Sequence, residues 1–263
     1  MKGEEKSPVR TISSKENKIF RLCEQLTHKK YRDKLGLYII EGENLLEEAV
    51  KNGAEIRTVL ARPDYGGSFF GIDHKAFFLD DKLFNRISQT ENSQGIMAIT
   101  VKPQISPTGF IDERGGGNFV VLDRLQDPGN IGTILRTADA AGYRLAIIMK
   151  GTADVFSPKV VRAATGSLFR MPVVFMDSVD ELTEYTRAAG KKLVATCLDG
   201  ERYYYDENLR ENIALIIGNE GSGISRELIQ SSDLKIKIPM YGNIESLNAS
   251  VAAGILMYEA VRP

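Results

Sequence analysis

The stretch FVVLDRLQDPGNIGTILRTADAAG, residues 119–142, decides the fold class of the larger part of this chain. It opens with an uninterrupted apolar run. Pro128 then suits the first turn of a helix, and Gly142 suits its exit. Apolar residues recur at helical spacing within that segment: Ile131, Ile134, Leu135 and Ala138. The stretch therefore predicts a buried strand that leads directly into an amphipathic helix.

The same alternation of strand and helix continues to the C-terminus. Apolar runs predict further strands at 143–150, 171–176, 191–198, 212–218 and 234–240. Helical patterns separate most of these strands, at 157–169, 178–190, 224–232 and 246–262. Strands that are apolar without interruption are typical of a mostly parallel sheet with helices on both faces, so we expect an α/β domain over residues 118–263.

A smaller α/β domain is predicted over residues 1–103. Residues 1–15 are polar and are expected to fray. Helical patterns follow at 14–26, 44–53 and 82–90, and strand patterns at 37–40, 56–63, 75–80 and 95–102. Residues 104–117 are rich in Pro and Gly and are expected to form a linker. The glycines at 115–117 precede a strand instead of following one, which favours a flexible connector over a dinucleotide-binding turn.

The bulk composition excludes several classes of protein. The chain has 263 residues and a formal net charge of -1, so a strongly basic protein that coats nucleic acid is excluded. The only cysteines, Cys23 and Cys197, are far apart, and His28 and His74 are isolated, so no metal site is expected. The polar N-terminus lacks a signal region, and no run reaches the ~18 apolar residues of a membrane span. We therefore expect a cytoplasmic protein without a membrane segment.

Two segments of the larger domain carry polar residues where α/β sheets bind ligands. In the first, residues 123–142, Asn130 and Arg136 lie off the apolar stripe of the predicted helix, just past the end of a strand. A solvated surface charge is the alternative interpretation of Arg136. In the second, residues 214–225, a strand ends in a glycine-rich turn that holds Glu220. A tight loop with an exposed carboxylate is the alternative interpretation there.

The third segment, residues 238–260, runs from a strand through a loop into the last helix. Ser246 and Asn248 are natural residues for a helix start, which is their structural interpretation. The helix is unusually rich in small residues, which allow another backbone to approach closely, although alanine also simply favours helices. Each of the three segments is ambiguous when it is considered alone.

Together the three segments resemble the three motifs of the SpoU/TrmH branch of the SPOUT methyltransferases. The first motif, N-x-G-x-x-x-R-T-A, matches Asn130–Ala138, and the second, G-x-E-x-x-G, matches Gly218–Gly223. The third, I-P-M…S-L-N-x-S-x-A, matches Ile238–Ala252, with Ala249 where a valine is frequent. The first domain, through EGENLLEEAV and SQGIMAIT, resembles the L30e-like substrate-binding module of rRNA ribose methylases.

The resemblance implies both a fold and a cofactor. The larger domain is expected to be an α/β-knot, in which the C-terminal segment is threaded through a loop to give a deep trefoil knot. The smaller N-terminal domain is expected to be L30e-like, and the protein to be a homodimer. S-adenosylmethionine is the implied cofactor, held largely through main-chain contacts by five residues: Thr196, Gly218, Ile238, Met240 and Leu247.

The implied activity is transfer of a methyl group to a ribose 2′-hydroxyl of RNA. Arg136 resembles the catalytic arginine of the family and is expected to grip the phosphate beside the target ribose and to stabilise the developing alkoxide. Whether Arg136 itself takes the proton stays open, because a free guanidinium is a poor base. Asn130 and Glu220 are expected to orient Arg136 and the ribose, and Ser246 and Asn248 to shape the pocket.

The first domain is the expected reader of the RNA. Residues 1–34 hold ten Lys or Arg and five Asp or Glu, and the candidate RNA contacts gather at Lys29, Lys30, Tyr31 and Arg32. A domain of this size favours large-subunit (23S) rRNA as substrate. The alternatives are the same chemistry on tRNA, a catalytically silent RNA-binding or assembly factor, and, remotely, a nucleotide-dependent dehydrogenase.

Overall fold

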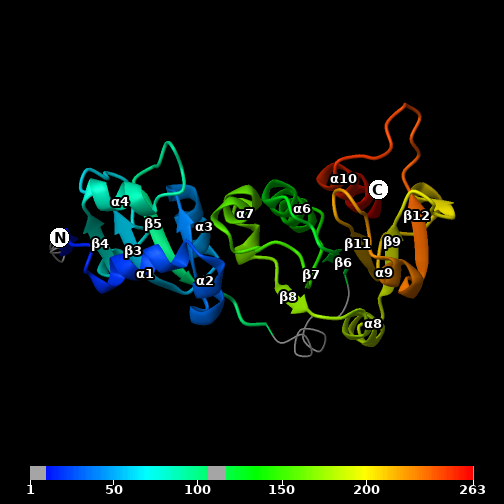
Figure 1. Ribbon diagram of the computed structural model, residues 1–263, viewed down its shortest axis with the longest axis horizontal. Coiled ribbons are helices and arrows are strands. Elements are labelled where there is room, and N and C mark those ends of the chain that lie inside the picture. Colours follow the sequence, from blue (N-terminus) through cyan, green and yellow to red (C-terminus); the bar gives the residue numbers. More distant parts are fainter. Residues whose placement is uncertain (1–9, 106–116, 263) are drawn as a thin grey trace, which may run out of the picture. The chain divides into compact units, whose positions relative to one another are not determined.

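The computed structural model describes residues 10–105 and 117–262, in two compact units. Unit 1 comprises Met1–Lys102 together with Phe156–Arg162, and unit 2 comprises Pro103–Val155 and Ala163–Pro263. Each unit has its own sheet (Figure 1). Most of the predicted linker, residues 106–116, lies outside the described residues. No helix in the described part of the chain is long and apolar enough to cross a membrane.

Unit 1 is built on a mixed five-stranded sheet of order β1-β4-β3-β5-β2, in which β5 runs antiparallel to both of its neighbours. Its strands are β1 (Arg10–Ile12), β2 (Leu37–Glu41), β3 (Ile56–Ala61), β4 (Ala76–Leu79) and β5 (Ile96–Val101). Its helices are α1 (Lys18–Leu26), α2 (Lys29–Leu35), α3 (Glu43–Lys51), the 3-10 turn η1 (Asp73–Lys75) and α4 (Asp81–Ile87). The apolar faces of α1 and α4 pack on the sheet and close the core.

Two elements of unit 1 were not predicted. β1 lies in the segment expected to fray, and it is held by parallel pairing with β4. α2 is almost wholly polar, and its Arg32 is 4% exposed, with Nη1 donating to the Leu26 carbonyl at 2.7 Å. The guanidinium therefore joins α2 to the end of α1. This placement corrects the expected role of Arg32, which is a packing residue and not a surface contact for RNA.

Residues 156–162 are a third departure, because the sequence placed them wholly within the larger domain. The Phe156 ring packs on Tyr38 of β2, with ring centroids 5.0 Å apart. The Lys102 ammonium lies 4.9 Å from the centroid of the same ring. A short segment from the middle of the sequence of the larger domain thus completes the packing of unit 1.

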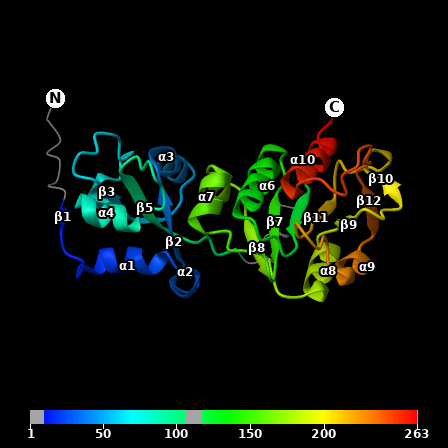
Figure 2. The same cartoon turned by 45° about the horizontal axis from the view of Figure 1, so that its top comes forward.

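Unit 2 has a fully parallel seven-stranded sheet of order β10-β12-β9-β11-β6-β7-β8 (Figure 2). Its strands are β6 (Phe119–Leu122), β7 (Leu145–Met149), β8 (Val173–Met176), β9 (Lys192–Thr196), β10 (Arg202–Tyr203), β11 (Ile213–Ile217) and β12 (Leu234–Lys237). Its helices include α6 (Pro128–Ala140), α8 (Val179–Ala188), α9 (Arg226–Ser231) and α10 (Ala249–Ala260). The short helix α7 (Pro158–Ala164) spans the boundary between the units.

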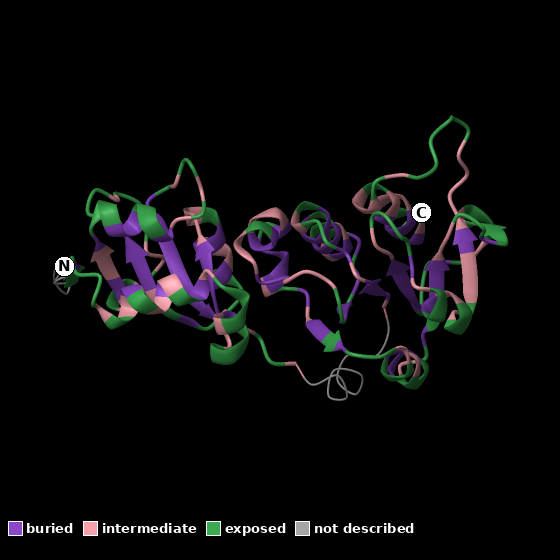
Figure 3. Ribbon diagram, viewed as in Figure 1, coloured by how far each residue is buried: buried purple, intermediate pink, exposed green. Residues whose placement is uncertain are grey.

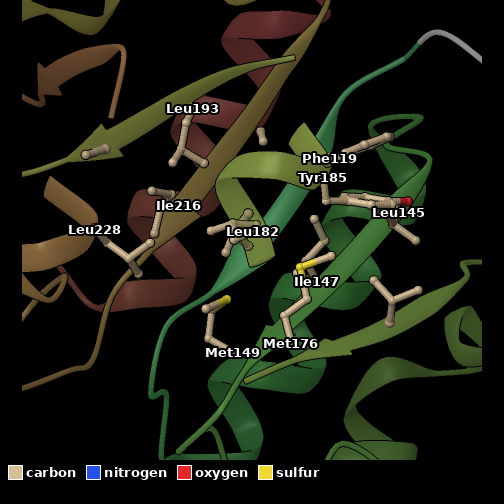
Figure 4. Packing of buried hydrophobic residues seen from close by; sticks show 14 of the residues in the cluster. Phe119, Leu145, Ile147, Met149, Met176, Leu182, Tyr185, Leu193, Ile216 and Leu228 are labelled. Atoms are coloured by element: carbon tan, nitrogen blue, oxygen red, sulfur yellow. The ribbon is translucent and has the colours of Figure 1, made fainter. Parts of the chain in front are cut away.

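Helices cover both faces of this sheet, as the apolar strands predict. On one face of the sheet, alternate side chains of the strands pack with Leu182 and Tyr185 of α8 and with Leu228 of α9 (Figure 4). α6 and α10 pack on each other, and Figure 1 shows them together on the opposite face. The central strands are buried throughout, whereas the segment that leads to α10 is exposed (Figure 3).

The C-terminal segment crosses the sheet. β12 lies beside β9, away from α6, yet the chain returns through residues 238–248 so that α10 packs against α6. Gly254 faces α6 in this contact, and a Cβ there would meet Cγ2 of Thr137 at 4.0 Å, an ordinary van der Waals distance. The crossing brings the start of α10 to the carboxyl ends of β6, β9 and β11, where ligands bind in open α/β sheets.

Candidate active site

A chain of hydrogen bonds joins the three polar segments at the carboxyl edge of the sheet in unit 2. The Asn130 amide donates Nδ2 to Oε1 of Glu220 at 3.2 Å. The Asn248 amide donates Nδ2 to Oδ1 of Asn130 at 3.0 Å. The relay Glu220–Asn130–Asn248 therefore connects the loop after β11, the first turn of α6 and the start of α10. The structure brings together three of the five predicted catalytic residues.

The Glu220 carboxylate is the anchor of this relay. It accepts the backbone N–H of Asp127 at 3.0 Å and that of Gln126 at 3.1 Å. Partial burial raises the pKa of Glu220, but the hydrogen bonds from these N–H groups and from the Asn130 amide lower it by more. The pKa therefore lies below its ordinary value. The side chain therefore stays a carboxylate and holds the entry to α6 in place.

Both helices at the site begin with a side-chain cap. Asp127 caps α6 by accepting the backbone N–H of Asn130 at 2.8 Å, and Pro128 follows in the first turn. Asn248 caps α10, with Oδ1 accepting the N–H groups of Ser250 and Val251. Asn248, not Ser246, is thus the residue at the helix start. Its amide is bifunctional, because Oδ1 caps the helix while Nδ2 extends the relay.

A pocket of about 410 Å³ lies beside the relay, between the loops after β9, β11 and β12. All five predicted cofactor residues line it, and so do Glu220 and Ser246. Thr196 donates Oγ1 to the Ile216 carbonyl, which fixes the end of β9 against β11. A Cβ on Gly218 would lie 2.3 Å from the Ile224 backbone N, so only glycine lets the loop fold back this closely.

The pocket has the size and chemistry that S-adenosylmethionine requires. Its volume falls within the ~300–1,000 Å³ typical of small-ligand sites. Its walls combine aliphatic side chains with small residues and the acidic side chains of Asp199 and Glu245. A planar adenine fits between apolar walls, and loops that follow parallel strands present main-chain groups to a polar ligand. The residues present therefore fit the cofactor that the sequence implies.

Arg136 lies apart from this pocket in a single chain. It is exposed on α6, and it is not among the residues that line the cavity. The side chain is therefore free to meet a ligand from the solvent side of the helix, but one copy of the chain does not bring it to the cofactor residues.

Asp123 and Arg124 form a second tie that sequence reasoning missed. Asp123 is 3% exposed, and its Oδ2 accepts the Ser225 N–H at 2.8 Å. Arg124 is paired with Asp123, adopts φ 58°, and donates Nη2 to the Gly223 carbonyl at 3.1 Å. The pair thus holds the Glu220 loop against the end of β6. The one signal in the sequence was a carboxylate directly after an apolar strand.

The predicted RNA contacts of unit 1 lie on and near α2. Lys29 and Lys102 both pair with Asp33, at 2.6 Å and 2.7 Å. Burial raises the pKa of Asp33, but its hydrogen bonds from Lys102 and Lys29 lower it overall. Lys30 is exposed and Tyr31 half-buried, so both are accessible. Among residues 10–105 and 117–262, no group of His, Cys, Asp or Glu is placed to hold a metal ion.

Comparison with protein families matches both units. Residues 117–258 match the SpoU rRNA Methylase family, and residues 17–98 match the MRM3-like substrate binding domain. A 23S rRNA (guanosine(2553)-2′-O)-methyltransferase, RlmP, from Bacillus subtilis is 36% identical and covers 95% of this chain and 98% of its own length. A 23S rRNA (uridine(2479)-2′-O)-methyltransferase from Streptomyces viridochromogenes is 31% identical and covers 99% of this chain and 95% of its own length.

Solved structures extend the likeness to the fold. An AdoMet-bound rRNA methyltransferase from Sinorhizobium meliloti superposes with a TM-score of 0.84 at 32% identity, covering 96% of this chain and 97% of that one. The SpoU methyltransferase AviRb from S. viridochromogenes, in complex with AdoMet, gives 0.84 at 31% identity, covering 93% and 97%. The SPOUT fold predicted from the sequence is confirmed by these matches.

Replacing Glu220 by Gln tests the anchor of the relay. The amide cannot accept both backbone N–H groups, so we expect the free energy of unfolding at pH 7 to fall by roughly 1 kcal/mol, a small value because the site is solvated. The pKa of Glu220 is depressed in the folded state, so its stabilisation is present above the ordinary carboxyl pKa of 4.5 and is lost as pH falls below it.

Urea unfolding at pH 7 and at pH 3.5 measures this difference. The gap between wild type and Glu220→Gln should narrow at the lower pH, whereas the exposed control Glu184→Gln should show no gap at either. A gap that stays constant with pH would contradict the role of the carboxylate.

Proposed function

Because this chain belongs to the SpoU rRNA methylase family, we propose that it is an S-adenosylmethionine-dependent 2′-O-ribose methyltransferase of large-subunit (23S) rRNA. The observation that carries the proposal is the joint presence of the relay Glu220–Asn130–Asn248 and the adjoining pocket, in a chain that matches 23S rRNA methyltransferases along almost its whole length. The two relatives are named for different nucleotides, so the proposal concerns the RNA and its ribose and not one base.

S-adenosylmethionine would be held in the pocket between the loops after β9, β11 and β12. When bound, it supplies an electrophilic methyl group on a sulfonium. Thr196 and Gly218 fix the shape of one wall, and Ile238, Met240 and Leu247 supply the opposite one.

The relay would orient the acceptor ribose. The side-chain amides of Asn130 and Asn248 are hydrogen-bonded to fixed partners. They are therefore pre-organised and do not need to change conformation when RNA binds. Arg136 would contact the phosphate beside the target ribose, where a guanidinium binds two oxygens at once and lowers the energy of the developing alkoxide. Ser246, on the pocket wall, would border the same ribose.

A homodimer would complete the site. α10 and its C-cap present a row of exposed apolar side chains at helical spacing, Val251, Tyr258 and Val261, and α10 packs against α6, on which Arg136 is exposed. An apolar stripe on two packed helices is what an isologous interface between two copies uses. Pairing through this face would place Arg136 of one copy at the edge of a site shared with the other.

Unit 1 would recognise the RNA. Lys30 and Tyr31 are accessible on α2, and Lys29 lies beside them in an ion pair with Asp33. Cations next to an aromatic ring can hold a phosphate and stack on a base, which suits looped RNA. Arg32 has no part in this surface, because it is committed to the packing of α1 and α2.

Methyl transfer from radiolabelled S-adenosylmethionine tests the proposed function. The acceptors are large-subunit rRNA, small-subunit rRNA and bulk tRNA, each purified from a strain that lacks this gene. We expect label in large-subunit rRNA only, at one alkali-resistant linkage, because a methylated 2′-oxygen cannot attack its phosphate. Label confined to tRNA would overturn the substrate, and no label in any acceptor would overturn the activity on free RNA.

Replacing Arg136 by Ala separates binding from chemistry. Arg136 does not line the pocket, so we expect the dissociation constant for S-adenosylmethionine, measured by calorimetry, to stay within about twofold of wild type. Turnover should fall at least ~100-fold, the size of effect seen when one preorganised charge-stabilising donor is removed. Arg187→Ala, an exposed arginine on α8, is the matched control and should leave turnover unchanged. Undiminished turnover in Arg136→Ala would remove this residue from the mechanism.

The homodimer is tested by Tyr258→Asp. A buried, unpaired carboxylate is strongly unfavourable at an apolar interface, so sedimentation velocity should show dimers of wild type and monomers of the variant. Methyl transfer should fall with dissociation. A wild-type protein that sediments as a monomer at micromolar concentration would contradict the shared site.

A further inference from the structure

A cluster of tyrosines lies on the surface of unit 2, outside the relay and the cofactor pocket. Tyr203 and Tyr205 stack with ring centroids 5.4 Å apart and planes inclined by 14°, and Tyr204 meets Tyr205 edge-on at 5.1 Å. The rings of Tyr203 and Tyr205 are 40% and 42% exposed, and Tyr241 is 92% exposed. Aromatic surface left open to this extent on a folded domain marks a place of interaction.

The tyrosine cluster, Tyr203–Tyr205 and Tyr241, adjoins the cofactor pocket through a groove of about 460 Å³. Tyr203 and Tyr241 line the groove. Five of the residues that line it also line the cofactor pocket: Leu198, Lys237, Ile238, Met240 and Glu245. Any RNA whose ribose reaches the transferred methyl must lay its neighbouring nucleotides on surfaces next to the pocket. The groove is one such surface.

The charges around the tyrosine cluster favour binding of a single RNA strand on the side of the groove where Lys237 lies. Arg202 and Lys235 are paired with Glu207 and Glu201, whereas the Lys237 ammonium lies 5.2 Å from the centroid of the Tyr203 ring. Glu245, on the groove wall, repels phosphates, so a backbone is directed toward Lys237. A compact ammonium beside stacked rings is the combination that holds a phosphate while a base stacks.

The tyrosine hydroxyls carry no negative charge that would repel the phosphates of such a strand. The ordinary pKa of a tyrosine, 10, already keeps the phenol neutral at physiological pH, and the partial desolvation of Tyr205, with Tyr241 and Asp206 nearby, shifts its pKa upward. A neutral phenol presents a π-face to a base and a hydroxyl to a sugar or a phosphate.

We propose that the tyrosine cluster is a stacking platform for unpaired bases of the substrate RNA next to the nucleotide whose ribose is methylated, with Lys237 on the adjoining phosphate. This inference rests on the proposed function, since it concerns the same RNA at the same site. The platform is separate from the basic surface of unit 1. Stacking is tolerant of base identity, so the cluster contributes affinity and register and does not select a sequence.

The double variant Tyr205→Leu/Tyr241→Leu tests the platform, and Tyr205→Phe/Tyr241→Phe is its matched control. Leucine keeps apolar bulk without a planar ring, whereas phenylalanine keeps the ring. We expect the leucine pair to raise KM for large-subunit rRNA at least ~10-fold, because one stacked base contributes about 1–3 kcal/mol. The phenylalanine pair should stay near wild type, and calorimetry should give both variants an unchanged dissociation constant for S-adenosylmethionine.

A salt titration separates the phosphate contact from packing. For Lys237→Gln, the slope of the logarithm of RNA affinity against the logarithm of salt concentration should become shallower by roughly 0.7, as expected when one contact to single-stranded RNA is lost. An unaltered slope would overturn the role of Lys237, and an unaltered KM in the leucine pair would overturn the platform.

Two further outcomes distinguish the possible failures. If wild type methylates no RNA under any condition, the proposed function fails, and the platform fails with it. If the leucine pair loses the dimer in sedimentation, the cluster is a contact between two copies of the chain, and the stacking platform is overturned while the methyltransferase stands.

Discussion

The hydrogen-bond relay Glu220–Asn130–Asn248 is the constraint on which the geometry of the site depends. Its members lie in the loop after β11, the first turn of α6 and the start of α10, up to 118 residues apart in sequence, and each bond joins a different pair of these segments. The middle position requires an amide, because Asn130 donates to a carboxylate on one side and accepts from an amide on the other. An Asp at position 130 would place two carboxylates together, and an aliphatic residue would remove one hydrogen bond from Glu220 and the bond donated by Nδ2 of Asn248.

The parallel sheet makes this relay possible. Carboxyl ends of parallel strands meet at one edge, so loops after β6, β9, β11 and β12 converge without any further device. Convergence alone does not fix the loops, because each is free to move with respect to its neighbours. Asp123 and Arg124 add a tie between β6 and the Gly223 carbonyl, and Gly218 removes the side chain that would hold two backbone segments apart.

Sequence patterns predicted the elements that are stabilised by burial of their own apolar side chains. They missed the elements that are stabilised by one specific contact with a segment elsewhere in the fold. The central strands of unit 2, β6, β7, β9 and β11, are apolar and almost wholly buried, so their runs were clear in the sequence, whereas the exposed two-residue strand β10 was not predicted. β1 is held by its pairing with β4, and α2 by the buried guanidinium of Arg32, and neither contact leaves a periodic signal. Residues 156–162 pack in unit 1 for a similar reason, since the partner of Phe156 is Tyr38, which no local pattern connects to it. The motifs identified the cofactor pocket, but Asp123 and the tyrosine cluster lie outside them.

α10 presents three different faces to its surroundings. Ala249 and Ala252 line the cofactor pocket, whereas Ala253 and Leu256 are buried. A third face, with Val251 and Tyr258, is apolar and exposed. A helix that is apolar on all sides belongs in a place where all its sides are covered. The core and the cofactor account for two of these faces. The third face stays exposed on a helix that packs against α6, the helix that carries the exposed Arg136. In the proposed homodimer, a second copy of the same face would bury this stripe through an isologous contact.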